Sequence, residues 1–275
     1  MSKDQFVIVC VDSATTASIA LPWARHWAEQ LNHKSLFALH VSRDGGTPDW
    51  LTRLDVPYVS LQGDWHTAIE GLPTAFNGIL AVTAVDPTAP RTSLAHPKTL
   101  LHEFRDCKVA YLVVSDTSGL HDIATPPPGG PEPSDLRGRP LAVLTMTHHR
   151  EGKEKLVWAS YLARFLRYNI AIAHPDYRDG DLRMRWRNNM RFVDKLFSPL
   201  GIDYTTPTLP KLTQVDMLAI EHLHPDILIA RTTDTRERDL VDWLLPRIEP
   251  RLLTHHSHTP ILFLNPRDDL YILCD

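Results

Sequence analysis

The sequence predicts an α/β protein with two tandem doubly wound domains, each a mostly parallel five-stranded sheet with flanking helices. Three observations lead to this expectation. Strand and helix patterns alternate along the chain, a segment rich in proline and glycine interrupts them near the middle, and the alternation then begins again. A chain of 275 residues is long enough for two domains of ordinary size.

The first half shows the alternation element by element. Phe6 to Val11 is a continuous apolar run, which is typical of a buried parallel strand. A helix follows, because large apolar residues recur at four-residue spacing through Ile19, Trp23, Trp27 and Leu31. Further strands are expected at 35–41, 57–61, 79–85 and 109–114, and further helices at 66–76 and 96–105.

Residues 118–138 form the clearest break in the pattern. They include the run from Pro126 to Pro131, whose prolines and glycines cannot continue a helix or a central strand. We therefore expect a first domain at residues 1–117, a linker at 118–138 and a second domain at 139–275.

The second half repeats the series. In one helix, Val157, Tyr161 and Phe165 share a face that we expect to be buried. Strands are expected at 141–146, 170–173, 202–205, 227–230 and 261–264, and helices at 156–166, 182–197, 215–222 and 240–253. The halves also match locally, since residues 77–86 align with residues 225–234 at their Ile, Leu and final Asp. A duplicated α/β domain explains this repeat.

Composition excludes several classes of protein. The formal net charge is -4, without the basic excess that is usual in nucleic-acid-binding proteins. No apolar stretch approaches the ~20 residues of a membrane span, and the N-terminus lacks the apolar core of a signal peptide, so we expect a cytoplasmic protein. The three cysteines, Cys10, Cys107 and Cys274, are too far apart to suggest a disulfide framework or a zinc knuckle.

Several segments resemble the universal stress protein family. Residues 7–13 are similar to its first strand, which ends in Asp followed by a small hydroxyl residue, and residues 36–41 are similar to its second. Residues 224–229 resemble the start of its fourth strand, and residues 259–264 its closing strand. The resemblance covers nearly all of the chain in two tandem units and implies the adenine nucleotide alpha hydrolase-like fold.

ATP-binding members of this family carry a motif of Gly, two residues, Gly, nine residues, then Gly and Ser or Thr after the fourth strand. The glycines let the backbone approach the phosphates. This chain has no glycine in residues 79–118 or 202–275. Pro87 and Pro90 also remove two N–H donors from the first loop, and Asp234, Glu237 and Asp239 would repel a triphosphate at the second. We therefore expect degenerate motifs, no tight ATP binding and no required cofactor, although weak binding of an adenine nucleotide stays open.

The residual ligand pocket expected from this resemblance contains Asp12, Ser13, Thr232, Thr233 and Arg236. Asp12 and Ser13 follow the first strand, where they would contact a base or ribose. The alternative, which the missing glycines favour, is an Asx turn or a helix cap. The other three residues lie in the second loop, where their side chains could hold an anion.

Histidines and basic residues form the remaining clusters. His148 and His149 follow a strand, whereas His255, His256 and His258 precede one, so we expect the two groups at different levels of the fold and no metal site. A basic stripe at four-residue spacing either docks an acidic partner or, as is more common, forms a solvated helix face. Its members are Arg183, Arg187, Arg191 and Lys195.

The C-terminal tail predicts one more strand. Residues 265–268 read as a turn and residues 270–273 as a strand, which could form a hairpin or pair with an edge strand of the other unit or of another chain. The family resemblance implies dimerisation through the last strand. We therefore expect the two domains to pair within the chain, with a possible homodimer through the C-terminal strand.

No catalytic constellation stands out. The first hypothesis is a non-catalytic stress-response or regulatory protein that acts through an unidentified protein partner or a small ligand, with no nucleic acid and no membrane as partners. The second is a nucleotide-binding protein with a degenerate adenine pocket in the first domain and slow hydrolysis. The third is an enzyme of a related α/β nucleotide-binding class. The missing glycines favour the first.

Overall fold

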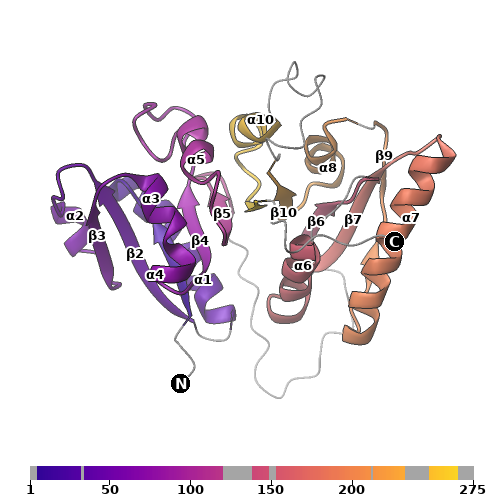
Figure 1. Cartoon of the computed structure of the whole chain (residues 1–275), viewed down its shortest axis with the longest axis horizontal. Helices are drawn as coiled ribbons and strands as arrows, with labels where there is room; N and C mark the ends of the chain where they lie inside the picture. The colour runs from indigo at the N-terminus through magenta and orange to yellow at the C-terminus, as the bar shows by residue number, and fades with distance from the viewer. Residues whose placement is uncertain are drawn as a thin grey trace. The chain divides into compact units, whose positions relative to one another are not determined.

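The computed structural model describes residues 5–31, 34–119, 138–148, 153–211, 213–232 and 248–265. The chain divides into two compact units, which Figure 1 draws with their elements labelled. The first unit holds Met1–Gly119 together with Ala230–Arg267, and the second holds Leu120–Ile229 together with Asp268–Asp275. Residues 230–267, which the sequence assigned to the second domain, thus belong to the first compact unit.

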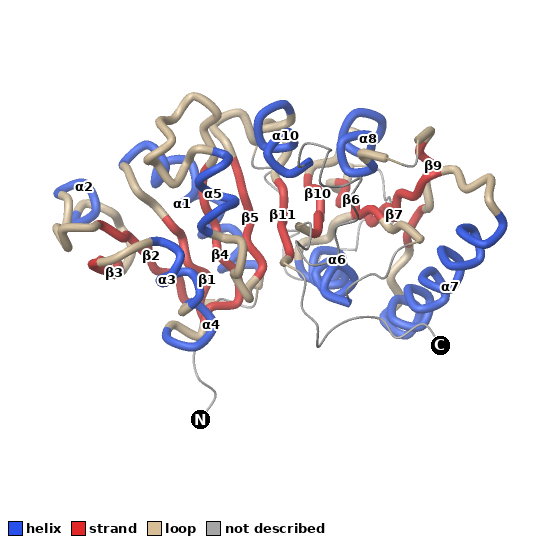
Figure 2. The backbone as a smooth tube through the Cα atoms, turned by 45° about the horizontal axis from the view of Figure 1, so that its top comes forward, coloured by secondary structure: helices blue, strands red, loops and turns tan. Residues whose placement is uncertain are grey.

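The first unit is built on a sheet with strand order β3-β2-β1-β4-β5-β11 (Figure 2). The first five strands are parallel, and their order reverses between β1 and β4, as in doubly wound folds. Val7, Ile8 and Val9 of β1 are fully buried, which explains the unbroken apolar run. The strands are β1 (Phe6–Cys10), β2 (Ser35–Ser42), β3 (Tyr58–Gln62), β4 (Gly78–Ala84), β5 (Ala110–Val114) and β11 (Ile261–Leu264).

Helices flank this sheet, and α1 packs against β1 and β4. Three members of the apolar stripe predicted for α1, Trp23, Trp27 and Leu31, are buried, and the fourth, Ile19, is half-buried. The helix predicted at 66–76 is divided at Gly71 into α3 and α4, and Pro73 in the first turn of α4 lacks the N–H that a continuous helix would need. The helices are α1 (Ala14–Gln30), α2 (Asp49–Thr52), α3 (Trp65–Glu70), α4 (Leu72–Ala75), α5 (Pro97–Glu103) and α10 (Ile248–His255).

Strand β11 lies beside β5 in the first unit's sheet, although it is far along the chain. It pairs antiparallel with β5, and the rings of Phe263 and Tyr111 stack with centroids 5.3 Å apart. Just beyond the strand, the Asn265 amide donates hydrogen bonds to the carbonyl oxygens of Phe104 (2.7 Å) and Cys107 (2.8 Å). These bonds fix the end of β11 to the turn that follows α5.

The second unit repeats the α/β scheme, with parallel strands in the order β10-β6-β7-β8 and β9 pairing with β7. The predicted α/β class with mostly parallel sheets is confirmed, whereas β9 and the short 3-10 helix η1 were not predicted. The elements are β6 (Leu141–Thr145), α6 (Lys153–Phe165), β7 (Asn169–Pro175), α7 (Gly180–Phe197), η1 (Ser198–Leu200), β8 (Tyr204–Thr205), β9 (Thr208–Leu209), α8 (Val215–Leu223) and β10 (Ile227–Arg231).

The predicted buried face of α6 is wrong. Val157 and Tyr161 are 40% and 41% exposed, and Phe165 is exposed as well. The helix instead buries a neighbouring face that includes Leu156, Ala159 and Leu162. This face also carries Lys155, whose ammonium group donates a 2.8 Å hydrogen bond to the carbonyl oxygen of Thr145 in β6. The buried face thus carries the small Ala159 side chain and the hydrogen bond from Lys155 to Thr145. Val157, Tyr161 and Phe165 lie on the exposed side of the helix.

Parts of the predicted organisation lie outside the described residues. They are the linker, apart from residues 118, 119 and 138, the C-terminal strand 270–273, and residues 240–247 of one predicted helix. Among the described residues, no helix is both long and apolar enough to cross a membrane.

Candidate functional site

The first unit offers a site where its strand order reverses. Parallel doubly wound sheets bind ligands in the crevice beyond the carboxyl ends of their strands at such a point. Here Asp12 and Ser13 follow β1, and the loop from Asp86 to His96 follows β4. The contacts of these residues decide whether the crevice is available to a ligand.

The Asp12 carboxylate is engaged by the protein's own donors. One oxygen accepts hydrogen bonds from the Ser93 hydroxyl (2.6 Å) and the Leu94 amide (2.7 Å). The other accepts from the Thr16 hydroxyl at 3.1 Å. Asp12 therefore ties the loop after β4 to the first turn of α1. It is not the residue that caps the helix.

Ser13 is the residue that caps α1. Its hydroxyl accepts from the backbone amide of Thr16 at 3.2 Å, and the Thr16 hydroxyl accepts from the Ser13 amide at 3.1 Å. This reciprocal pair is a capping box, in which the hydroxyl of each residue accepts a hydrogen bond from the backbone amide of the other. The helix-cap alternative for this segment thus applies to Ser13.

The loop after β4 is held by its own side chains. The Asp86 carboxylate accepts from the amide (2.8 Å) and the hydroxyl (2.7 Å) of Thr88, and these bonds lower the pKa of Asp86. The Asp86 amide donates to the carbonyl of Ala95, which closes the loop across its base. Such a closed loop differs from a glycine-rich loop that turns successive N–H groups toward a phosphate.

Thr232 does not join Asp12. Its hydroxyl donates to the Asn265 side-chain oxygen at 2.6 Å, and its amide donates to the carbonyl of Leu264 at the end of β11. Strands β4 and β5 separate β11 from β1, and neighbouring strands lie about 4.8 Å apart, which places β11 roughly 14 Å from β1. Thr233 and Arg236 lie outside the described residues.

A buried histidine and an apolar hollow lie near this crevice. His40 in β2 has its Nδ1 atom 3.3 Å from the Ser60 hydroxyl and its ring edge-on to Trp50. Burial lowers the pKa of His40, although the charges of Asp12 and Asp44 oppose the shift. The hollow has a volume of about 400 Å³ and is lined by Ala14, Ala17, Ser18, Leu21, Pro22, Arg25, Trp50 and Leu54. Sequence reasoning did not single out His40 or the hollow.

The predicted histidine clusters fall in different units. His148 lies in the second unit, where its amide donates to the Tyr177 hydroxyl at 2.8 Å and its ring packs edge-on against that residue. His256 and His258 lie in the first unit with ring centroids 6.0 Å apart, as does His255. His149 lies outside the described residues.

One other group of side chains in the described part has the composition of a metal site. His66 and Glu70 of α3 and Asp106, just after α5, have ligand atoms that all lie within 4.8 Å of one another. Sequence reasoning missed this group. The four-residue spacing of His66 and Glu70 was a usable signal, because it places both residues on one face of a helix, but Asp106 joins them only in the fold.

Comparison with known proteins finds the fold and no close relative. No family model matches the chain, and no curated protein matches it significantly. A universal stress protein from Archaeoglobus fulgidus superposes with a TM-score of 0.60 over 95% of this chain and 97% of its own, at 12% identity. A protein of unknown function from Pseudomonas aeruginosa gives 0.54 over 97% and 94%, also at 12% identity. The chain therefore has the fold of universal stress proteins.

Proposed function

We propose that this chain is a non-catalytic regulatory protein of the universal stress protein type, which acts through protein or small-ligand contacts and does not bind ATP tightly. One observation carries the proposal. The carboxylate that would face a nucleotide, Asp12, is already bonded to Ser93, Leu94 and Thr16.

The energetic argument follows from those bonds. A hydrogen bond to a charged group contributes about 1.5–3 kcal/mol, and 1.4 kcal/mol is a factor of ten in affinity. Freeing Asp12 from its two short bonds costs on the order of 3 kcal/mol or more, so ATP binding would be weakened roughly a hundredfold before any new contact forms. The prolines in the loop also remove donors that a phosphate would need.

Nucleotide content and nucleotide stabilisation test the proposal directly. The full chain is purified and denatured, and released small molecules are identified by absorbance and mass spectrometry. The native protein is then melted with and without ATP or AMP. We expect no near-stoichiometric nucleotide and a change in melting temperature below about 1 °C. Copurified adenine nucleotide near one per chain, or stabilisation by several degrees, contradicts the proposal.

The matched variant is Ser93→Ala, which removes one of the two short bonds to Asp12 without touching the carboxylate. If the loop is what blocks the crevice, this variant should gain stabilisation by AMP that the wild-type chain lacks. If neither protein responds, the missing phosphate loop alone accounts for the absence of binding.

A degenerate adenine pocket is the second candidate, and the hollow between α1 and α2 favours it. Its volume of about 400 Å³ is within the range of small-molecule sites, and Trp50 offers a ring for stacking. Under this alternative, AMP stabilises the wild-type chain and Trp50→Ala abolishes that effect. Slow hydrolysis would appear as phosphate release from ATP.

For partners, we propose that last-strand pairing is used within one chain. The antiparallel β5–β11 pair supports this, since β11 follows the second series of strands in the sequence. A homodimer through residues 270–273 is a separate proposal, which light scattering of the full chain and of a chain ending at Asp268 would test.

A further inference from the structure

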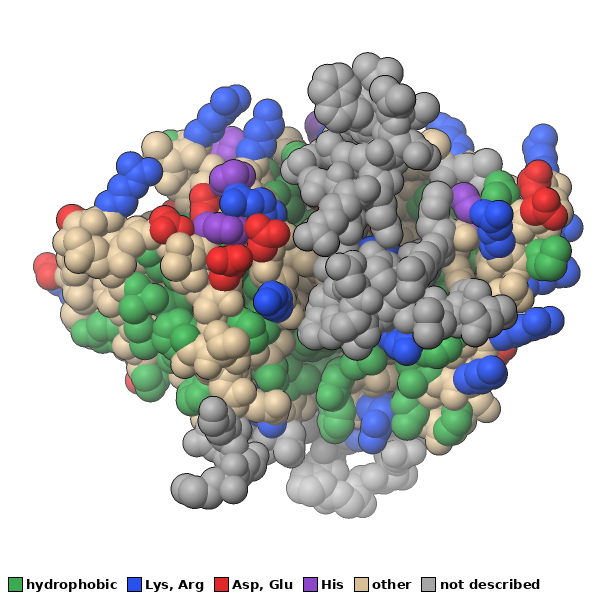
Figure 3. Space-filling model, viewed as in Figure 1, with side chains coloured by type: hydrophobic (Ala, Val, Ile, Leu, Met, Phe, Trp, Pro, Cys, Tyr) green, Lys and Arg blue, Asp and Glu red, His purple; other side chains and the backbone are tan. Residues whose placement is uncertain are grey.

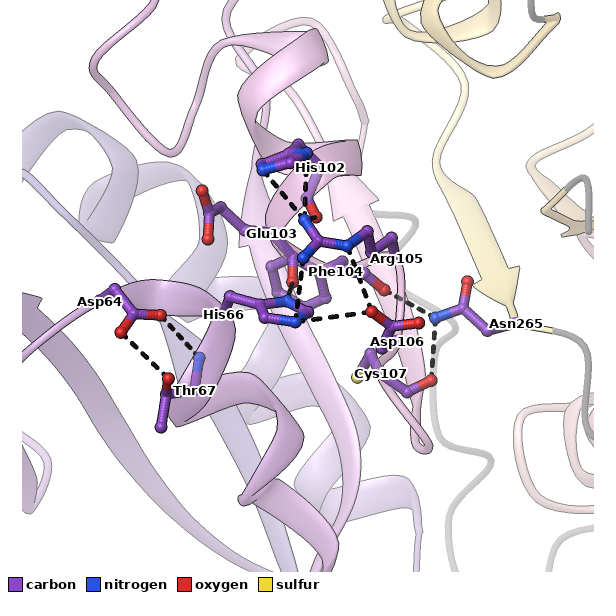
Figure 4. Close-up of polar contacts among 10 residues, drawn as sticks. All are labelled: Asp64, His66, Thr67, His102, Glu103, Phe104, Arg105, Asp106, Cys107 and Asn265. Carbon is purple, nitrogen blue, oxygen red and sulfur yellow. Dashed lines mark hydrogen bonds and ion pairs between the residues drawn. The ribbon is translucent and has the colours of Figure 1, made fainter. Parts of the chain in front are cut away.

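Two short segments of the first unit bring an imidazole and two carboxylates together. His66 and Glu70 lie four residues apart on α3, and Asp106 follows α5. The His66 Nε2 atom is 3.5 Å from the nearer Asp106 oxygen, and Figure 4 shows the two side chains directed toward each other. On the face drawn in Figure 3, histidine, acidic and basic side chains gather over α3 and α5.

We propose that His66, Glu70 and Asp106 form a binding site for a divalent transition-metal ion such as Zn²⁺. Zinc binds imidazole nitrogen and carboxylate oxygen at about 2.0–2.2 Å, so two tetrahedral ligands lie about 3.4 Å apart. The His66–Asp106 distance of 3.5 Å already matches that spacing. An imidazole among carboxylates also favours zinc and similar ions over Ca²⁺ or Mg²⁺, which select oxygen ligands.

The orientation of His66 suits a ligand. Its Nδ1 atom lies 3.2 Å from the backbone carbonyl oxygen of Glu103. A carbonyl can only accept, so Nδ1 carries a proton, and in the neutral ring the lone pair lies on Nε2, 3.2 Å from the Arg105 guanidinium. Metal-binding histidines have the same arrangement, with one ring nitrogen donating to a carbonyl and the other free to ligate.

The helix that carries two of the three ligands is fixed at its start. Asp64 caps α3, accepting from the amide (2.9 Å) and hydroxyl (3.0 Å) of Thr67. The backbone positions of His66 and Glu70 are thereby set, and a carboxylate oxygen of the exposed Glu70 side chain already lies within 4.8 Å of the ligand atoms of His66 and Asp106.

Arg105 now occupies the place of the cation. Its guanidinium lies 3.2 Å from the His66 Nε2 atom and 3.2 Å from the Asp106 carboxylate, and it also contacts the His102 ring (Figure 4). The Arg105 side chain is 43% exposed, so it can swing into solvent. A metal ion must therefore displace Arg105, and the two cations compete for the same groups.

This competition gives a specific test. Zinc chloride is titrated into the full metal-free chain by calorimetry, and Co²⁺ absorption reports the ligand field. We expect one ion bound at this site, with affinity falling at least tenfold in His66→Gln and in Asp106→Asn. Arg105→Gln should raise the affinity several-fold, because it removes the resident cation. His258→Gln is the matched control, a surface histidine elsewhere in the unit, and should leave the affinity unchanged.

Each possible result of the zinc titrations either supports the proposal or overturns it. Circular dichroism and melting curves first establish that each variant is folded. If His66→Gln does not fold, Asp106→Asn, at an exposed position, provides the test. Absence of zinc binding overturns the proposal, and so does zinc binding that the His66 and Asp106 variants leave intact. A loss of affinity in Arg105→Gln equal to that in His66→Gln also overturns it, since the arginine would then support the ion and not compete with it.

Discussion

Replacing Asp12 by Ala tests whether this carboxylate is a structural anchor. The change leaves the Leu94 amide, which belongs to a residue only 2% exposed, without its 2.7 Å acceptor, and the Ser93 hydroxyl loses its 2.6 Å partner. Each bond to a charged group contributes about 1.5–3 kcal/mol, and water can replace part of the loss at the half-buried hydroxyl. We therefore expect a destabilisation of about 2–4 kcal/mol, or roughly 4–16 °C in melting temperature.

Urea denaturation followed by tryptophan fluorescence measures this loss. Because two compact units need not unfold together, amide exchange of residues 86–96 gives the local result and should become faster in Asp12→Ala. Asp116→Ala, at an exposed carboxylate of the same unit, is the control. The anchoring role is refuted if Asp12→Ala stays within about 0.5 kcal/mol of the wild type with unchanged exchange. If Asp12→Ala is as stable as the wild type but is no longer stabilised by AMP, Asp12 contacts a ligand and is not a structural anchor.

Three further outcomes follow from the first unit. Gly78→Ala should destabilise it by about 1–3 kcal/mol, because a Cβ atom would lie 3.0 Å from the Leu72 carbonyl oxygen, whereas Gly180→Ala, with open space around it, should be neutral in the same urea titration. Asn265→Ala should cost about 1–3 kcal/mol, because it removes the hydrogen bonds to the carbonyl oxygens of Phe104 and Cys107, of which the Phe104 oxygen keeps the bond from the Cys107 amide; faster amide exchange in β11 reads this out. Burial lowers the pKa of His40 below its ordinary value of 6.5, so the unfolded chain takes up a proton first as the pH falls. Stability should therefore decline below about pH 6.5, and urea titrations at pH 7.5 and 5.5 should differ less in His40→Gln.

The sequence predicts the sheets better than the helices that cover them. A strand buried on both faces is apolar at nearly every position, so β1 and β4 are marked by composition, with buried Thr83 of β4 donating a hydrogen bond to the Cys10 carbonyl. A helix needs the correct face as well as the correct length. In α6, Val157, Tyr161 and Phe165 form an apolar stripe, yet the helix buries Leu156, Ala159 and Leu162 beside Lys155. The buried face includes a contact of Lys155 with the Thr145 carbonyl in another element, which no local pattern contains.

The same limit applies to the candidate metal site. His66 and Glu70 are close in the sequence, and helical spacing is enough to place them together. Asp106 comes from a different helix end, and Glu103 contributes only a backbone carbonyl, which every residue possesses. The part of the site made within one helix was therefore accessible to sequence reasoning, and the part made by packing was not.

The loop after β4 is held by side-chain hydrogen bonds at the place where ATP-binding universal stress proteins have glycines. Once a loop cannot turn its N–H groups toward a phosphate, the Asp at the end of β1 loses the neighbour that would make it useful for nucleotide binding. Here Ser93 and Leu94 supply donors of their own to Asp12, and Asp86 closes the loop base through Thr88. A ligand that needs the Asp12 oxygen held by Ser93 and Leu94 would compete with these two short bonds. The hydrogen bonds of Asp12 give it a structural role in this fold, so the presence of the residue alone does not indicate nucleotide binding.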